Sequence, residues 1–157
     1  MKKLTMLLLI LILTGCGSNV NQKGYDLYLK ELKAAKVAIN DSPYNVSVSF
    51  DKLTSDEVVY QIVIDGATKT LSNLKVLVYH DQTTDDVFPS LGIFDGQYNL
   101  ITAATKEDKV NIRGINLVGY IPFKQDLTKF KMTIKILVMY DDGGKTIKNY
   151  HVYNFNK

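Results

Sequence analysis

The chain has 157 residues, 46% of them hydrophobic and 22% charged, with a single cysteine. It has 19 basic and 16 acidic side chains. Two of the basic ones are Lys2 and Lys3 at the start, and the only arginine is Arg113. Beyond Lys3 the chain is close to neutral, so it lacks the basic surface that binds nucleic-acid phosphates, and one cysteine excludes an intramolecular disulfide.

The first residues predict an export signal. Lys2 and Lys3 precede an almost wholly apolar run over residues 4–13. A membrane-spanning helix needs about 20 apolar residues, so this run is too short to span and fits the apolar centre of a signal peptide. We therefore expect residues 1–15 to be a signal peptide that is removed on export.

Residues 13–16, Leu-Thr-Gly-Cys, follow that run. They resemble the lipobox of bacterial lipoproteins, in which the cysteine receives a diacylglycerol thioether and cleavage falls just before it. The resemblance implies that Cys16 is the acylated first residue of a tether over residues 16–24. The protein would then be lipid-anchored on the extracytoplasmic face of a cell membrane. A plain secretory signal that happens to end near a cysteine is the alternative.

Residues 25–40 are predicted to form one amphipathic helix. Its apolar side chains recur at three- and four-residue steps, and residues 40–43, Asn-Asp-Ser-Pro, end it because Pro43 disfavours helix just before itself. Leu29 and Leu32 lie on the apolar stripe and are candidates for an interface, either with the rest of the chain or with a partner helix. The stripe consists of Tyr25, Tyr28, Leu29, Leu32, Ala35 and Ile39.

From residue 44 onward the apolar period changes to two, which is typical of strands with one buried face. The segment around residues 74–79 carries apolar side chains on both faces, so we expect that strand to be central. The clearest strand covers residues 130–140. The predicted inward side chains are Val46, Val48 and Phe50; Val58, Tyr60, Ile62 and Ile64; Leu74, Val76 and Val78; and Phe130, Met132, Ile134, Ile136, Val138 and Tyr140.

About seven short strands over residues 44–157 predict an all-β, antiparallel β-sandwich behind the N-terminal helix, with a closed barrel as the alternative. Gly114 is expected at a β-bulge. Residues 115–155 resemble the last strands of a fibronectin type III or immunoglobulin-like module: residues 118–123 contain Gly-Tyr-Ile-Pro-Phe, and Asp-Asp-Gly-Gly at 141–144 joins the final pair. Phe130 stands where that family places a corner tyrosine and lacks its hydroxyl.

Residues 81–92 are predicted to form a long acidic loop with an apolar tip. Asp85, Asp86, Phe88 and Leu91 are candidates for contact with a partner, because loops at the end of such a scaffold often carry recognition. Alternatively, the apolar side chains cap the open end of the core. Oxygen ligands for calcium could come from Asp81, Asp85, Asp86 and Asp95, although their spacing fits no EF-hand.

The sequence offers little for catalysis. His80 and His151 are the only histidines, are expected at strand ends or on the surface, and lack the companions that a zinc site needs. We therefore expect no enzyme, no cofactor and no resident metal. The predicted function is a non-catalytic binding module for a protein or cell-wall polymer. The alternatives are a structural accessory subunit of an envelope machine (transport, conjugation or phage-related) and, less favoured, a hydrolase that uses Asp85 and Asp86.

Overall fold

The structure, a computed structural model, describes residues 19–36, 41–82 and 90–156, apart from the side chains of residues 19–23, 90 and 91. This part of the chain contains one α-helix, eight strands and one short 3-10 turn at Leu127–Lys129. The elements are α1 (Asn19–Ala34), β1 (Asn45–Lys52), β2 (Glu57–Asp65), β3 (Leu71–His80), β4 (Ser90–Leu100), β5 (Asn111–Ile112), β6 (Gly114–Pro122), β7 (Lys131–Asp142) and β8 (Lys145–Asn156).

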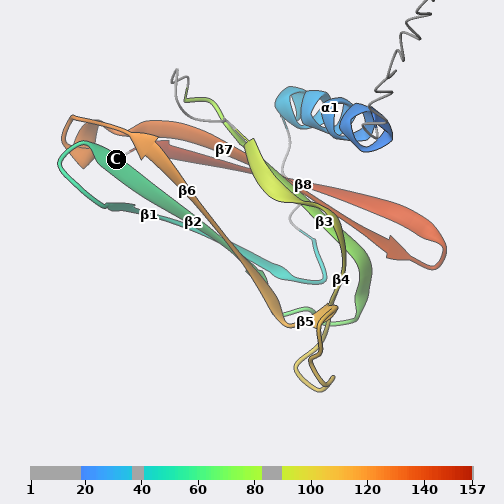
Figure 1. The fold of residues 1–157 in the computed structure, drawn as a ribbon. Helices are drawn as coiled ribbons and strands as arrows, with labels where there is room; N and C mark the ends of the chain where they lie inside the picture. Colours follow the sequence, from blue (N-terminus) through green and yellow to red (C-terminus); the bar gives the residue numbers. More distant parts are fainter. Residues whose placement is uncertain (1–18, 37–40, 83–89, 157) are drawn as a thin grey trace, which may run out of the picture.

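The strands form two sheets, so the prediction of a mainly β chain with one N-terminal helix is confirmed. One sheet has the order β1-β2-β6, and the other has the order β5-β4-β3-β7-β8. The neighbouring strands pair antiparallel except β4 and β5, which are parallel. Figure 1 shows α1 lying over the five-stranded sheet, on the side away from β1 and β2.

One core receives side chains from both sheets. The predicted alternation is confirmed for β2, whose Val58, Tyr60, Ile62 and Ile64 are all buried there. It is confirmed for β7 too, where every second residue from Met132 to Tyr140 belongs to the same core. Alternation at period two places these residues on one face of each strand, so the facing surfaces of the sheets exclude water together.

β3 is the middle strand of the five-stranded sheet, as its two apolar faces predict. Val76 and Val78 point into the core between the sheets, whereas Leu77 points outward. On that outer face Leu77 packs with Leu137 and Met139 of β7, and with Leu32 of α1. The helix therefore covers the second apolar face of the sheet.

The helix occupies different residues from those predicted. It begins at Asn19 rather than Tyr25, so part of the expected tether is helical, and it ends at Ala34 rather than near residue 40. The Lys135 ammonium of β7 donates hydrogen bonds to the carbonyls of Lys33 (2.5 Å) and Ala35 (2.6 Å). A lysine that satisfies the last carbonyls of a helix favours an end at that point, and no signal for it exists in the local sequence.

Two further expectations need correction. Gly114 is not at a bulge: the register between β2 and β6 runs without interruption from Glu57–Pro122 to Asp65–Gly114, and Gly114 begins β6. The connection after β3 is also shorter than the predicted loop, because β4 starts at Ser90. The register irregularities of this fold lie instead in β3 and β4, next to α1.

Candidate functional site

A groove on the outer face of the five-stranded sheet, beside α1, is built by an irregularity of β4. Val76 pairs with Ile93, and Leu74 pairs with Tyr98, so residues 94–97 stand opposite Lys75 alone. Extra residues in one strand force it to bend away from its partner and change the direction of its side chains. This segment supplies one wall of the groove, with the residues Phe94, Asp95, Gly96 and Gln97.

A second irregularity, in β3, supplies the polar end of the groove. Leu71 and Leu74 are both buried in the core although they are three positions apart, and the register with β7 shifts between Ser72 and Lys75. Asn73 takes up the extra length with a φ of 51°, a left-handed conformation that asparagine adopts more readily than most residues. As a result the Asn73 side chain reaches toward β7.

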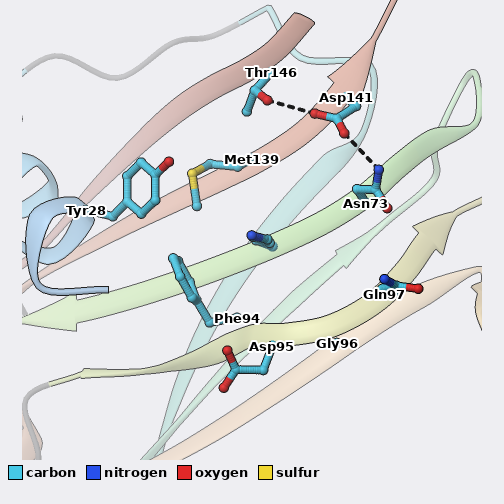
Figure 2. Close-up of a pocket in the computed structure, with 10 residues that line it drawn as sticks. Tyr28, Asn73, Phe94, Asp95, Gly96, Gln97, Met139, Asp141 and Thr146 are labelled. Atoms are coloured by element: carbon cyan, nitrogen blue, oxygen red, sulfur yellow. Dashed lines mark hydrogen bonds between the residues drawn. The ribbon is translucent and has the colours of Figure 1, made fainter. Parts of the chain in front are cut away.

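The two irregular segments, α1 and the strands β7 and β8 enclose a cavity of about 430 Å³. Figure 2 shows Tyr28, Met139 and Phe94 at one end, and Asn73, Asp141 and Thr146 at the other. Gln97 lies along β4, and the Asp95 carboxylate points to the other side of that strand. We call this site the α1 groove.

Hydrogen bonds fix the polar end of the α1 groove. One carboxylate oxygen of Asp141 accepts from Asn73 Nδ2 (2.8 Å), and the other accepts from Thr146 Oγ1 (2.8 Å). These bonds, followed by the field of Lys75, lower the pKa of Asp141 below its ordinary value. Each carboxylate oxygen retains lone-pair capacity for one more donor, so the ionised Asp141 can still accept from a ligand.

The opposite end is aromatic. The rings of Tyr28 and Phe94 lie with their centroids 5.6 Å apart, and Tyr25 meets the Phe94 ring edge-on at 5.8 Å. Met139, which is 1% exposed, forms the floor. The Lys75 ammonium lies 5.1 Å from the centroid of Phe94, a cation–π distance, and has no hydrogen-bond acceptor among the described residues.

The predicted recognition loop is only partly visible in the described residues. Asp85, Asp86 and Phe88 lie outside them. The backbone of Leu91 is part of β4, where it pairs with Val78, rather than part of a loop. The candidate contact surface on this loop therefore stays a prediction.

Calcium binding by the acidic residues of this region also stays a prediction. The Asp81 carboxylate accepts a hydrogen bond from the backbone N–H of Thr133 in β7 (3.0 Å) and another from the side chain of its neighbour Gln82 (3.1 Å). Asp81 follows β3, whereas Asp95 lies within β4. Over residues 19–36, 41–82 and 90–156, no three acidic, histidine or cysteine side chains gather in a way that could hold a metal ion.

The helix residues singled out in the sequence contact the chain's own sheet. Leu32 is fully buried, and Leu29 is partly buried in the same cluster. Glu31 beside them accepts from the Lys148 ammonium at 2.7 Å and from the Tyr150 hydroxyl at 3.2 Å. Among the described side chains of α1, the large apolar one that is exposed is Leu27, at 55%.

Both histidines are buried, so of the two expected positions, a strand end or the surface, the surface is wrong for both. His80 does end β3, but it is fully buried against the ring of Tyr60, and neither of its ring nitrogens has a hydrogen-bond partner. His151 is 6% exposed and shares a hydrogen bond of 3.0 Å with the Tyr44 hydroxyl. Burial lowers the pKa of both imidazoles.

No family model, curated protein or solved structure matches this chain. Within the described residues, no helix has the length and hydropathy required to cross a bilayer. Cys16 and the preceding run lie outside those residues. The fold brings aromatic, cationic, amide and carboxylate groups together in the α1 groove. No local sequence motif predicts this site.

Proposed function

We propose that this chain is a lipoprotein that is anchored through Cys16 on the extracytoplasmic face of a cell membrane and acts as a non-catalytic binding module. The observation that carries the proposal is the sequence Leu-Thr-Gly-Cys at residues 13–16, directly behind Lys2, Lys3 and a short apolar run. Small residues before the cysteine admit a peptidase, and the cysteine sulfur supplies the nucleophile that takes the lipid.

An anchor of this kind holds a small domain firmly. Each buried methylene contributes about 0.8 kcal/mol, and two acyl chains bind stably where one binds only marginally. Between Cys16 and the start of α1 at Asn19 stand only Gly17 and Ser18. At about 3.5 Å of reach for each residue, the helix and its groove would be held close to the bilayer.

We further propose that the two sheets form an immunoglobulin-like sandwich of the fibronectin type III kind. The support lies in the strand order: β1-β2-β6 corresponds to strands A, B and E, and β4-β3-β7-β8 corresponds to C′, C, F and G. Phe130, 3% exposed, precedes β7 where this family places its corner aromatic residue. Because one fold can serve many functions, the binding role has to be argued from the site itself.

A binding role fits the composition of the α1 groove better than a catalytic one. Catalysis by a side chain requires a nucleophile or a proton-transfer group with a suitable pKa in reach of the substrate. Both imidazoles lie in the core, and Asp141 is held in its ionised form by two hydrogen bonds. The groove instead presents fixed donors and acceptors, which suit recognition.

The alternative of an accessory subunit that docks through Leu29 and Leu32 has less support. Leu32 is fully buried against Leu77 and Leu137 of the chain's own sheet, so it is not available to a partner while α1 stays in place.

Acylation tests the proposal. Cells that express the full chain are grown with an alkyne-tagged fatty acid, and the protein is followed by in-gel fluorescence and by partition into a detergent phase. The wild type and the matched control Ser18→Ala should be labelled and partition with detergent, whereas Cys16→Ala should show neither property. Equal behaviour of wild type and Cys16→Ala would refute the anchor.

A further inference from the structure

We infer that the α1 groove is a saccharide-binding site, and that the ligand of the proposed binding module is the carbohydrate of a surface polymer. This inference rests on the proposed binding function and names the ligand class for it. The observation behind it is that one groove places polar groups of opposite hydrogen-bonding character beside a small aromatic surface.

The first step concerns hydrogen-bonding character. The Lys75 ammonium can only donate, the Asp141 carboxylate can only accept, and the Gln97 amide and Thr146 hydroxyl can do both. A simple anion would be matched by donors alone, and a metal or organic cation by acceptors alone. Groups that donate and accept at the same atom, as sugar hydroxyls do, match a mixed set of this kind.

The second step concerns charge. Lys75 and Asp141 line the same groove with opposite charges, and the field of Lys75 acts on Asp141. Their fields partly cancel at the centre of the groove, so a ligand of either sign gains from one group and loses against the other. A neutral, polar ligand avoids that loss and can bond to both.

The third step concerns the apolar end. Tyr28 and Phe94, with Met139 below them, form an apolar corner directly beside the polar groups. A sugar ring has C–H groups on one face and hydroxyls around its edge, so it can pack on an aromatic corner while its hydroxyls reach polar groups. The volume of about 430 Å³ lies within the range of small-molecule sites.

The fourth step concerns preorganisation. Asn73 and Thr146 hold Asp141 from both sides, so the polar end does not have to order itself when a ligand binds. The walls are formed by the irregular segments of β3 and β4, and such irregularities commonly re-aim side chains next to functional sites.

The test uses the full, detergent-solubilised chain, labelled with ¹⁵N, titrated separately with chitotriose, maltotriose and an uncharged tripeptide as probes. We expect at least one saccharide to shift the amide resonances of residues 73–75 and 94–97 in a saturable way, and the tripeptide not to. Lys75→Met and Gln97→Ala should each weaken that binding by about tenfold, the loss typical of one good hydrogen bond to a charged group or of a bidentate amide contact.

Matched controls separate loss of contact from loss of fold. Lys131→Met at the start of β7 and Gln61→Ala on β2, in the other sheet, should bind as the wild type does. Absence of saturable shifts with both saccharides, or equal weakening by the control variants, would overturn the assignment. Saturable binding of the tripeptide alone would refute the saccharide assignment but would still support a binding module. The acylation of Cys16 is measured in a separate experiment, so neither result bears on it.

Discussion

His80 illustrates how strongly the core of this protein selects one protonation state. Its imidazole is fully buried, it touches the ring of Tyr60, and both of its nitrogens lack partners among the described residues. Burial penalises the charged form and lowers the pKa of His80, an effect that outweighs the opposing field of Asp81. Burial also raises the pKa of Tyr60 to about 12, so both rings are neutral near neutral pH.

This environment predicts a loss of stability in mild acid. An unfolded histidine has a pKa of about 6.5, so below that pH the unfolded state binds more protons than the folded state and is stabilised relative to it. The free energy of unfolding should fall between about pH 7.5 and about pH 5.5, by at most about 1.4 kcal/mol per pH unit for each buried histidine. Urea titrations at both pH values measure it.

His80→Leu separates this effect from that of His151, whose pKa is lowered by burial in the same direction. The variant should lose less stability than the wild type over the same interval, because it has no proton to bind at that site. An identical loss in both proteins would show that His80 is not the group responsible.

Gly119 of β6 is a second residue whose identity follows from Tyr60. A methyl group at Gly119 would lie 2.1 Å from Cζ of the Tyr60 ring, and that side chain is 1% exposed in the packed core. Gly119→Ala should therefore lower the free energy of unfolding by about 1–3 kcal/mol, the usual cost of overpacking a core.

Gly114 provides the matched control on the same strand, because its added methyl would come no closer than 3.3 Å to Asp65. Gly114→Ala should change stability by less than Gly119→Ala in the same urea titration. Equal effects of the two substitutions would mean that the contact with Tyr60 does not decide the residue at position 119.

At the scale of elements, α1 is attached to the sheet by one buried leucine and several polar contacts. Leu32 packs on Leu77, Leu137 and Met139, while Lys148 and Lys135 hold Glu31 and the final carbonyls of the helix. A cluster of this size lies outside the main core, so the helix and the strands are expected to unfold in separate steps.

Leu32→Ala tests that attachment. Removing a fully buried leucine side chain costs about 2–5 kcal/mol, and here the cost should be limited to the docking of α1. Amide hydrogen exchange should accelerate across α1 and remain slow in β2 and β7. Leu27→Ala, which alters a side chain that is 55% exposed, should leave exchange unchanged in both regions.

Acceleration spread evenly over the strands would contradict an independently docked helix. It would show instead that α1 is part of the same cooperative unit as the core.

The elements also show where sequence patterns succeed and where they do not. The inward side chains of β2 and β7 could be predicted because alternation at period two is a local property that burial alone produces. The irregular segment 94–97 could not, because it is defined by the register with β3, and register depends on two strands together. The helix end at Ala34 depends on Lys135, about one hundred positions away in the sequence.

At the scale of the whole molecule, the buried core and the proposed binding site lie on opposite faces of the five-stranded sheet. The side chains that the two sheets share form a buried core. The helix α1 lies over the outer face of the five-stranded sheet (Figure 1), and the α1 groove lies beside it on that face. In the proposed arrangement, the anchor at Cys16 holds that same face near the membrane. The anchor stays a prediction from a short linear motif. The groove could not be predicted from the sequence, because five elements, α1, β3, β4, β7 and β8, meet to build it.

The mass of the N-terminal tryptic peptide of the mature protein tests this account most directly. Trypsin cleaves after Lys23, so the account predicts a peptide that begins at Cys16 and carries the added mass of a diacylglyceryl group on its sulfur. A peptide with an unmodified Cys16, or a mature chain that begins at another residue, would contradict the anchor and with it the placement of the binding module at a membrane.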